Sequence, residues 1–410
     1  MAAVASRVPS GPAQVAVASF LAARAAPTGG FWVALAGGVA VARVAERRGA
    51  RQGFGASIAA MLETVAIIGP ARFGVPLTQA ITAPILGRLH ARGTGTLAQL
   101  VVCVLLRLVH NAATTAFFIW VIAGGLDAYA GTYDALGRHL GFEVGTADAL
   151  VLTAVALLGW ALFASAVQVL VYRRGLLAWG DLEKGLAAPA ETSRVASAAG
   201  PAQPGRFDPR AVSLAAAVAF VLLLSSTSWP VLLAVALFLA IAWSVSRPDP
   251  SVLPTGLAFC AVLGGGALLF GIGGGLGLDT ALRRALRAAL LVLAATWLRA
   301  AARSEGLREV GRRVLGRLRR IPAMPEAARV LDSLGSEGRL TQAARSLGDS
   351  IRDVPRQPLP FLDAVLAWVV SESQRDGGSP PGGPARALEF RAHDWLLIAL
   401  AAAPGLALAA

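Results

Sequence analysis

A polar face within an apolar stretch is the first feature of this sequence with the chemistry of a binding site. The apolar run 97–124 contains four polar residues at steps of three and four: Arg107, His110, Asn111 and Thr114. This spacing places the four side chains on one face of a helix. An arginine inside such a run needs a counter-charge or a cavity, and Glu63 in the run 58–68 is its candidate partner. The pattern predicts either a solute pocket or ion path, or a hydrogen-bonded network inside the protein.

Catalytic, metal and nucleotide sites are not predicted. His90, His110 and His139 lack the spacing of metal ligands. The only lysine, Lys184, does not lie in a Gly-Lys-Ser/Thr sequence, so the chain has no P-loop. The polar face contains no nucleophile and no acid pair with recognisable spacing, so an intramembrane enzyme is the least favoured function. We expect no enzyme activity and no bound cofactor, with ATP hydrolysed on another subunit if the protein performs uphill work.

Composition indicates a membrane protein. Of 410 residues, 56% are hydrophobic and only 15% are charged, which is more apolar surface than one soluble core can bury. At least six apolar runs reach membrane-spanning length, so we expect an all-α polytopic fold in the cell's inner (cytoplasmic) membrane. The net charge of +13 comes almost entirely from arginines in connectors and at helix ends. The positive-inside rule explains that distribution, so lipid is an expected partner and nucleic acid is not.

The apolar runs fall into two halves, from which we predict two transmembrane helical bundles. Residues 1–186 form the first bundle, for which five or six spans are expected. Residues 187–206 are rich in Ala, Pro, Gly and Ser without periodicity, which is typical of a flexible linker. Residues 207–410 form the second domain, which ends with a short apolar run at 395–410.

A charged stretch interrupts the second half between residues 303 and 356. Its apolar residues recur at steps of three and four, with breaks at Pro322, Pro325 and the glycines of 335–338. This pattern predicts three amphipathic helices. The arginine excess predicts that they form a platform on the cytoplasmic side of the membrane.

Two short arginine motifs lie on this platform: Ala302-Arg303-Ser304 and Ala344-Arg345-Ser346. With them, residues 205–410 resemble the transmembrane T-component of energy-coupling factor (ECF) transporters, which carries two Ala-Arg-Gly-like triplets at a similar separation on cytoplasmic coupling helices. Three further segments are similar to that family: Arg206-Phe207-Asp208-Pro209-Arg210 before the first span, a helix with Arg283, Arg284 and Arg287, and Arg391-Ala392-His393-Asp394-Trp395 before the last span. Ser304 and Ser346 stand where the family has glycine.

The resemblance implies a membrane subunit of an ECF-type ABC importer. Two cytoplasmic ATPase subunits would dock on coupling helices within 303–356 and drive uptake of a small solute such as a vitamin. The implied partner-binding residues are those of the two triplets: Ala302, Arg303, Ser304, Ala344, Arg345 and Ser346. Arginine suits docking because its guanidinium pairs with a carboxylate through two parallel hydrogen bonds.

Several alternatives stay open on the residues alone. Arg303 and Arg345 are also compatible with solvated helix faces or with contacts to anionic lipid. Residues 1–186 have the size of an ECF substrate-binding subunit but carry none of its motifs, so a separate substrate-binding membrane subunit is a further expected partner. The alternative function is that of a membrane-anchored scaffold that binds another cytoplasmic protein.

Overall fold

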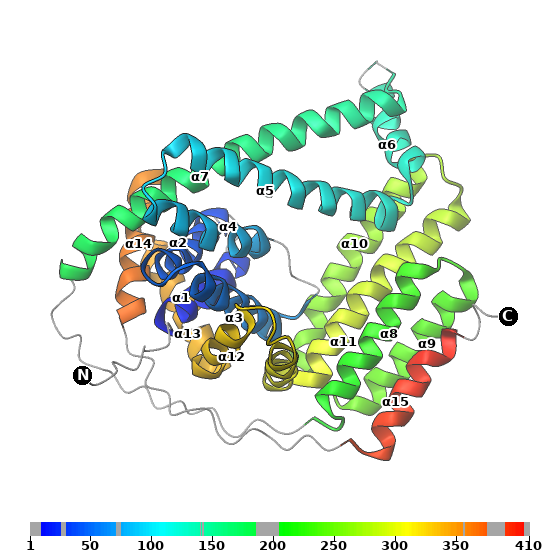
Figure 1. Ribbon diagram of the computed structural model, residues 1–410. Helices are drawn as coiled ribbons and strands as arrows, with labels where there is room; N and C mark the ends of the chain where they lie inside the picture. Colours follow the sequence, from blue (N-terminus) through cyan, green and yellow to red (C-terminus); the bar gives the residue numbers. More distant parts are fainter. Residues whose placement is uncertain are drawn as a thin grey trace.

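The chain folds into helices throughout the parts that the structure describes. This computed structural model describes residues 10–25, 30–70, 75–139, 141, 143–185, 205–355, 357–374 and 390–405. Every regular element in these ranges is a helix, as expected (Figure 1). The linker predicted at 187–206 lies outside the described residues up to residue 204.

Five helices in the described ranges are long and apolar enough to cross a membrane: Thr96–Ala123, Thr146–Lys184, Trp229–Ser246, Pro250–Gly273 and Leu278–Arg317. A sixth apolar helix, Pro209–Ser225, is shorter. The multi-pass character predicted from composition is therefore supported by helix length and hydropathy. Only two of the five helices lie in the first half, where five or six spans were expected.

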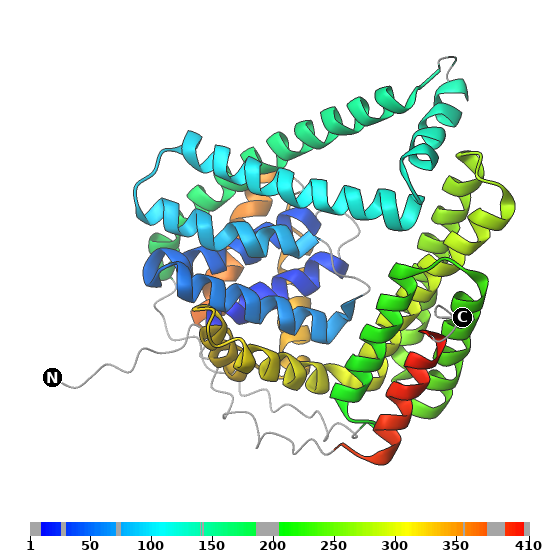
Figure 2. The same cartoon turned by 45° about the vertical axis from the view of Figure 1, so that its right-hand side comes forward.

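One bundle contains α8 (Pro209–Ser225), α9 (Trp229–Ser246), α10 (Leu253–Gly273), the crossing part of α11 (Leu278–Arg317) and α15 (Ala392–Ala402). These helices lie side by side in Figures 1 and 2. Their core includes Trp297, whose ring meets Phe238 edge to face at 5.7 Å and whose indole N–H donates to Ser246 Oγ over 3.2 Å. Aromatic rings of this size supply much of the packing energy of such a core.

Two segments that are far apart in the sequence, around Asp208 and Asp394, meet where this bundle begins. Asp208 caps α8 by accepting a hydrogen bond from the Arg210 backbone N–H at 2.8 Å, with Pro209 as the first helical residue. The Asp208 N–H in turn donates to the carboxylate of Asp394, in the first turn of α15, at 2.9 Å. Burial opposes ionisation of Asp208, but hydrogen bonds from Arg210 outweigh it and hold the pKa of the carboxyl below its ordinary value.

A second group of helices combines both halves of the sequence. It contains α1 (Ser10–Ala25), α2 (Gly30–Arg48), α3 (Ala50–Ile68) and α4 (Val75–Ala91) together with α12 (Met324–Ser333), α13 (Glu337–Arg352) and α14 (Pro358–Gln374). Residues 13–22 of α1 and most of α2 are buried, which is typical of helices that are apolar on most of their surface. These two helices therefore pack inside protein rather than forming lipid-facing spans of their own.

The amphipathic helices expected between 303 and 356 are present, with breaks at the proline and glycine positions. Their apolar faces pack into the core of the second group: Val330 and Leu331 from α12, and Leu340 and Leu347 from α13, share it with α1 and α3. The faces expected to rest on the membrane thus cover the first helices of the chain instead.

The third part is a long helical pair that bridges the other two. α5 (Thr96–Phe117) continues as a π-helix (Phe118–Ala123), α6 (Leu126–His139) turns the chain, and α7 (Thr146–Gly185) returns. Figures 1 and 2 show α5 and α7 lying over the first helices and reaching α10 through α6. Large apolar side chains such as Leu105, Val155 and Phe163 point outward and stay exposed, as lipid-facing residues do.

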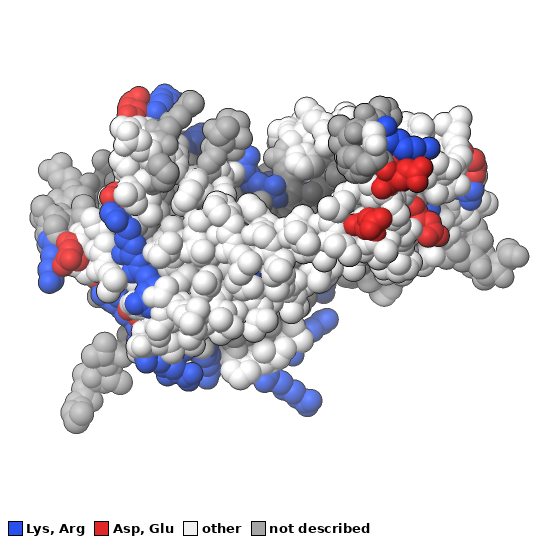
Figure 3. Space-filling model, turned by 90° about the horizontal axis from the view of Figure 1, so that it is seen from above, with Lys and Arg blue, Asp and Glu red and all other residues white. Residues whose placement is uncertain are grey.

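Charge is distributed unevenly along this pair. Figure 3 shows acidic side chains gathered at the end where α6 lies, and the acids of that segment include Asp127, Asp134 and Asp148. The opposite ends of α4 and α7 carry Arg88 and Arg173. The α6 end of the pair is therefore the more acidic one, while the other end mixes arginines with Asp181 and Glu183 of α7.

The close approach of α2 and α4 gives a direct test of this packing. A Cβ added at Gly87 would collide with the backbone oxygen of Ala42, whereas one added at Gly159 in α7 would meet nothing within 4 Å. We expect Gly87→Ala to lower the free energy of unfolding by about 1–3 kcal/mol, because backbone has to move. Gly159→Ala is expected to leave it unchanged or raise it by up to about 1 kcal/mol. Thermal unfolding in detergent measures both; equal stabilities would contradict the α2–α4 contact.

Candidate functional site

A break in α11 is the most unusual backbone feature of the chain. Arg303 has φ 59° and ψ 167°, in a region that is adopted almost exclusively by glycine. The break divides α11 into a bilayer-crossing part before Arg303 and a basic arm, Ser304 to Arg317, after it. Figure 2 shows that the two parts run in different directions. A strained residue persists only where surrounding contacts hold it, so the contacts on both sides of Arg303 matter.

One carboxylate binds both sides of the break. Glu337, at the start of α13, accepts a hydrogen bond from Arg299 Nη2 at 2.9 Å through Oε1 and one from Ser304 Oγ through Oε2. Arg299 also donates from Nε to the carbonyl of Ile67 at the end of α3, over 2.7 Å. Arg299 is only 5% exposed, so these two acceptors satisfy most of a buried cation. Together they join α3, α11 and α13.

A second ion pair extends this junction along the arm. Arg308 donates from Nε to Glu63 Oε2 at 2.7 Å and from Nη2 to the Gly335 carbonyl at 2.9 Å. Glu63 is 2% exposed, so its charge depends on this partner. The expected pairing of Glu63 with Arg107 is therefore wrong. It fails because α3 packs against α11, while Arg107 on α5 faces α7.

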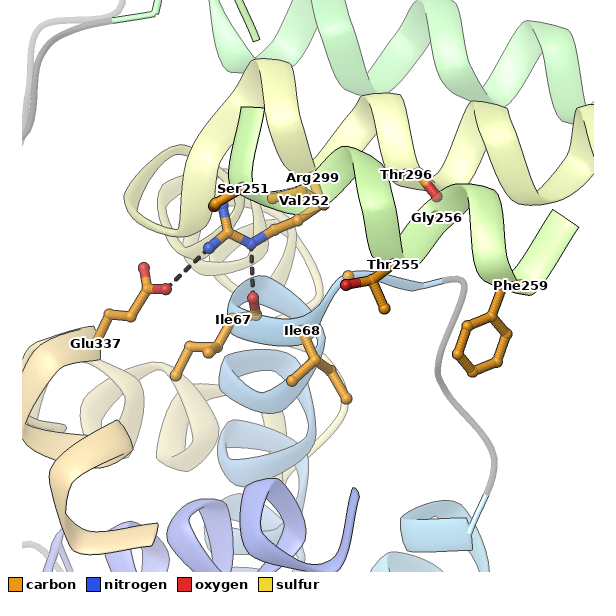
Figure 4. A pocket seen from close by; sticks show the side chains of 11 residues that line it. Ile67, Ile68, Ser251, Val252, Thr255, Gly256, Phe259, Thr296, Arg299 and Glu337 are labelled. Atoms are coloured by element: carbon orange, nitrogen blue, oxygen red, sulfur yellow. Dashed lines mark hydrogen bonds and ion pairs between the residues drawn. The ribbon is translucent and has the colours of Figure 1, made fainter. Parts of the chain in front are cut away.

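A cavity of about 210 Å³ opens beside the junction. Figure 4 shows Arg299 between Glu337 and Ile67 on one wall, with Thr255 and Phe259 of α10 on another. The cavity lies where α3 meets α10 and α11, so the two helix groups do not pack tightly there. Arg299 of α11 and Glu337 of α13 both line this cavity.

An acidic side chain beside the break, Asp249, is stabilised in its ionised form by nearby groups. Asp249 precedes α10, and its N–H donates to the Ala300 carbonyl at 3.2 Å. Burial opposes ionisation of Asp249, but hydrogen bonds from Ser251 and the positive charges of Arg299 and Arg303 hold the pKa of its carboxyl below the ordinary value. Arg303 therefore has an acidic neighbour, although its Nε atom is buried without a hydrogen-bond partner in the described ranges.

The residues of the two predicted triplets are of two kinds: some are buried in contacts within the protein, and the arginines are at least partly exposed. Ala302 and Ser304 are buried on either side of the break, and Ala344 is on the buried face of α13. Ser346 accepts a hydrogen bond from the indole N–H of Trp368 at 3.2 Å, which fixes α13 to α14. Arg345 is exposed and Arg303 is half-buried, so the two arginines are the members that remain available to a partner.

Only some residues of the polar face predicted on α5 face the interior of the protein. Arg107 is 4% exposed and donates to Gln168 Oε1 on α7 at 2.5 Å. His110 and Asn111 are half-buried, whereas Thr114 is exposed and donates to its own helix at the His110 carbonyl. The face thus turns inward at Arg107 and outward at Thr114.

The hydrogen-bond partner of Arg107, Gln168, and the partner of Gln168 in turn, Thr82, were missed by the sequence reasoning. Gln168 donates from Nε2 to Thr82 Oγ1 of α4 at 2.6 Å, which completes a chain of polar contacts across three helices. The signal was present: Ser165 and Gln168, like Gln79 and Thr82, are polar residues three positions apart in otherwise apolar runs. In the described part of the chain, no group of three or more His, Cys, Asp or Glu side chains is placed to hold a metal ion.

Comparisons of the chain with protein-family models, with curated proteins and with solved structures found no match. The function therefore has to be inferred from the geometry of the junction around Arg303.

The Arg308–Glu63 pair is expected to contribute strongly to stability. Glu63→Gln leaves the guanidinium of Arg308, which is 25% exposed, without its counter-charge, and losing a hydrogen bond between charged groups costs about 1.5–3 kcal/mol. Asp363→Asn provides the control, because Asp363 pairs with Arg174 over 3.0 Å with both side chains about half exposed. That exposed pair is expected to cost less than about 1 kcal/mol. Similar losses of thermal stability in the two variants would show that the Glu63 pair is not the buried contact described.

Backbone strain at Arg303 predicts that glycine is more stable than alanine at this position, the reverse of their order in a regular helix. Arg303→Gly and Arg303→Ala both remove the guanidinium, but only glycine adopts φ 59° without strain. We expect the glycine variant to be more stable than the alanine variant by about 1–3 kcal/mol. In a regular helix the order would be reversed, so a more stable alanine variant would show that α11 is unbroken at this residue.

Proposed function

We propose that this protein is the membrane subunit of an ECF-type importer, in which two cytoplasmic ATPase subunits drive uptake of a small solute. The observation that carries the proposal is α11, in which a helix long and apolar enough to cross a bilayer is followed, after a break, by a basic helical arm, with both sides of the break held by Glu337. A coupling subunit needs such a continuous connection between a docking surface and the spans.

Charge supports an orientation that suits this role. The end of α11 is rich in arginine, the α4–α5 connection and the end of α9 add Arg92 and Arg247, and acids gather at α6. The arginines of α11 at the α6 end, Arg284 and Arg287, are bound to helix carbonyls. Under the positive-inside rule the arginine-rich ends face the cytoplasm. In this orientation the arm and α13 lie on the cytoplasmic side of the inner membrane, where ATPase subunits can reach them.

Docking is assigned to Arg345 and Arg303. Arg345 projects from the exposed face of α13, and a guanidinium there fits a carboxylate in a groove of a partner protein. A displacement of α13 moves Glu337 and with it Arg299 and Ser304, on the two sides of the break. The same displacement acts on α1, because α13 packs against it. One docking event thus acts on both helix groups.

The first half of the chain is assigned the solute-binding role. α12 and α13 cover α3 and α1, so the helices that receive the ATPase subunits also contact the part that would hold the solute. This packing supports a chain that combines coupling and solute binding, with a separate substrate-binding membrane subunit as the alternative arrangement. The intramembrane enzyme considered from the sequence loses its support, because Glu63 and Arg107 belong to different contacts.

The proposal is tested by recovery of ATPase subunits with the tagged, full-length protein from its own cells. We expect Arg303→Gly combined with Arg345→Ala to reduce recovered ATPase subunits and activity at least about tenfold, because a lost desolvated charge pair costs roughly 2–5 kcal/mol. Glycine is used at 303 because it removes the guanidinium without adding backbone strain.

Arg319→Ala combined with Arg320→Ala is the matched control, since it removes the same charge from exposed positions outside the arm and the two triplets. Its recovery of ATPase subunits should equal that of the wild type. Wild-type recovery in the Arg303/Arg345 variant would contradict the proposal, and a different cytoplasmic protein in place of ATPase subunits would favour a scaffold.

A further inference from the structure

A buried cluster of hydrogen-bond donors lies where α5, α7 and α4 meet. Ser165, Gln168 and Tyr172 lie on one face of α7 and are each at most 1% exposed. Facing them from α5 are Arg107 and Cys103, both buried. Figure 1 shows that this region belongs to the long helical pair and is remote from the α11 junction.

The donors in this cluster outnumber the acceptors. Arg107 Nη2 and Cys103 Sγ both donate to the same atom, Gln168 Oε1, at 2.5 and 3.6 Å. Three other donor groups are buried without a hydrogen-bond partner in the described ranges: Arg107 Nε, Ser165 Oγ and Tyr172 OH. Gln79 Oε1 on α4 is a buried acceptor without a partner in the same ranges, so the three unpaired donor groups still outnumber it, although buried polar groups are normally paired.

The cluster also lacks negative charge. The ionisable groups that interact with Arg107 are the thiol of Cys103, the phenol of Tyr172 and the imidazole of His110, none of which is anionic at neutral pH. Glu63, the acid expected to neutralise Arg107, is bound to Arg308 instead. A buried guanidinium without a counter-charge is unfavourable, which indicates that an anion completes the site.

Burial restricts the source of this anion. Arg107 is 4% exposed, and the side chains of α7 that face it are at most 1% exposed, so a lipid headgroup on the surface of the protein does not reach the guanidinium. We therefore expect the anion to enter as part of a molecule that passes through the protein.

We propose that Arg107, with the hydroxyls of Ser165 and Tyr172, binds an oxyanion carried by the solute, a carboxylate or a phosphate group. The guanidinium supplies parallel N–H donors to two oxygens of the anion, and the two hydroxyls donate to the remaining lone pairs. Gln168 holds the guanidinium in place between α5 and α7. This inference rests on the proposed importer function and names the chemical class of its solute.

The test is anion-dependent thermal stability of the full-length protein in detergent, without ATPase subunits. Sodium acetate and sodium phosphate serve as minimal carboxylate and phosphate probes, against sodium chloride at matched ionic strength. A ligand that binds only the folded state raises the melting temperature, by roughly 2–4 °C at about ten times its Kd. We expect acetate or phosphate to exceed chloride by such a shift, and the more effective salt identifies the oxyanion.

Two variants make the result specific. Arg107→Met should abolish the anion-dependent shift and raise the melting temperature without anion, because it removes the uncompensated buried charge. Arg317→Met, which removes an exposed guanidinium, should keep the wild-type response. A wild type that responds no more to acetate or phosphate than to chloride overturns the proposal, as does an equal response in Arg107→Met. Because no ATPase takes part, the outcome is independent of the co-purification experiment.

Discussion

This structure depends on Glu337, whose carboxylate accepts two hydrogen bonds from α11. Its two oxygens bind Arg299 in the crossing part of α11 and Ser304 in the arm. The carboxylate therefore stabilises a left-handed residue, Arg303, that a helix would otherwise exclude. It also neutralises a guanidinium that is almost fully buried. Without it, Arg299 would retain only the Ile67 carbonyl, and the direction of the arm would no longer be fixed.

A second set of contacts holds α11 at its other end. Arg284 donates to the carbonyls of Ala123 and Gly124, and Arg287 donates to that of Val121, at the end of the π-helix that follows α5. Helix C-termini present unpaired carbonyls and negative partial charge, so arginines are suitable partners there. α11 thus contacts the α5–α7 pair at one end and the first helices at the other.

The positions of the helices could largely be predicted from the sequence, but their neighbours could not. Proline and glycine breaks placed the ends of α12 and α13 correctly, since those residues act on the local backbone. The burial of α1 and α2 was missed because alanine- and valine-rich helices look the same whether lipid or protein surrounds them. The break at Arg303 was invisible for a related reason: the helical periodicity continues through it.

The partners of charged residues were the least predictable part of the site. Arg107 was correctly expected to need a partner inside the protein, yet Glu63 was the wrong choice. Pairing depends on which helices pack together, and α3 lies against α11 through contacts between residues far apart in the sequence. The exposure of Arg345 followed from amphipathic periodicity, because the apolar positions of α13 fix which face is buried.

The central claim is that α11 relays movement from the cytoplasm. The side of the membrane on which α13 lies tests this claim most directly. Arg345→Cys and Asp134→Cys variants can be treated with a membrane-impermeant maleimide in intact and in permeabilised cells, with the native Cys103 buried and Cys260 half-buried. The account predicts that the cysteine at 134 reacts in intact cells and that the one at 345 reacts only after permeabilisation. Labelling of position 345 from outside would contradict it, because no cytoplasmic ATPase could then reach the arm.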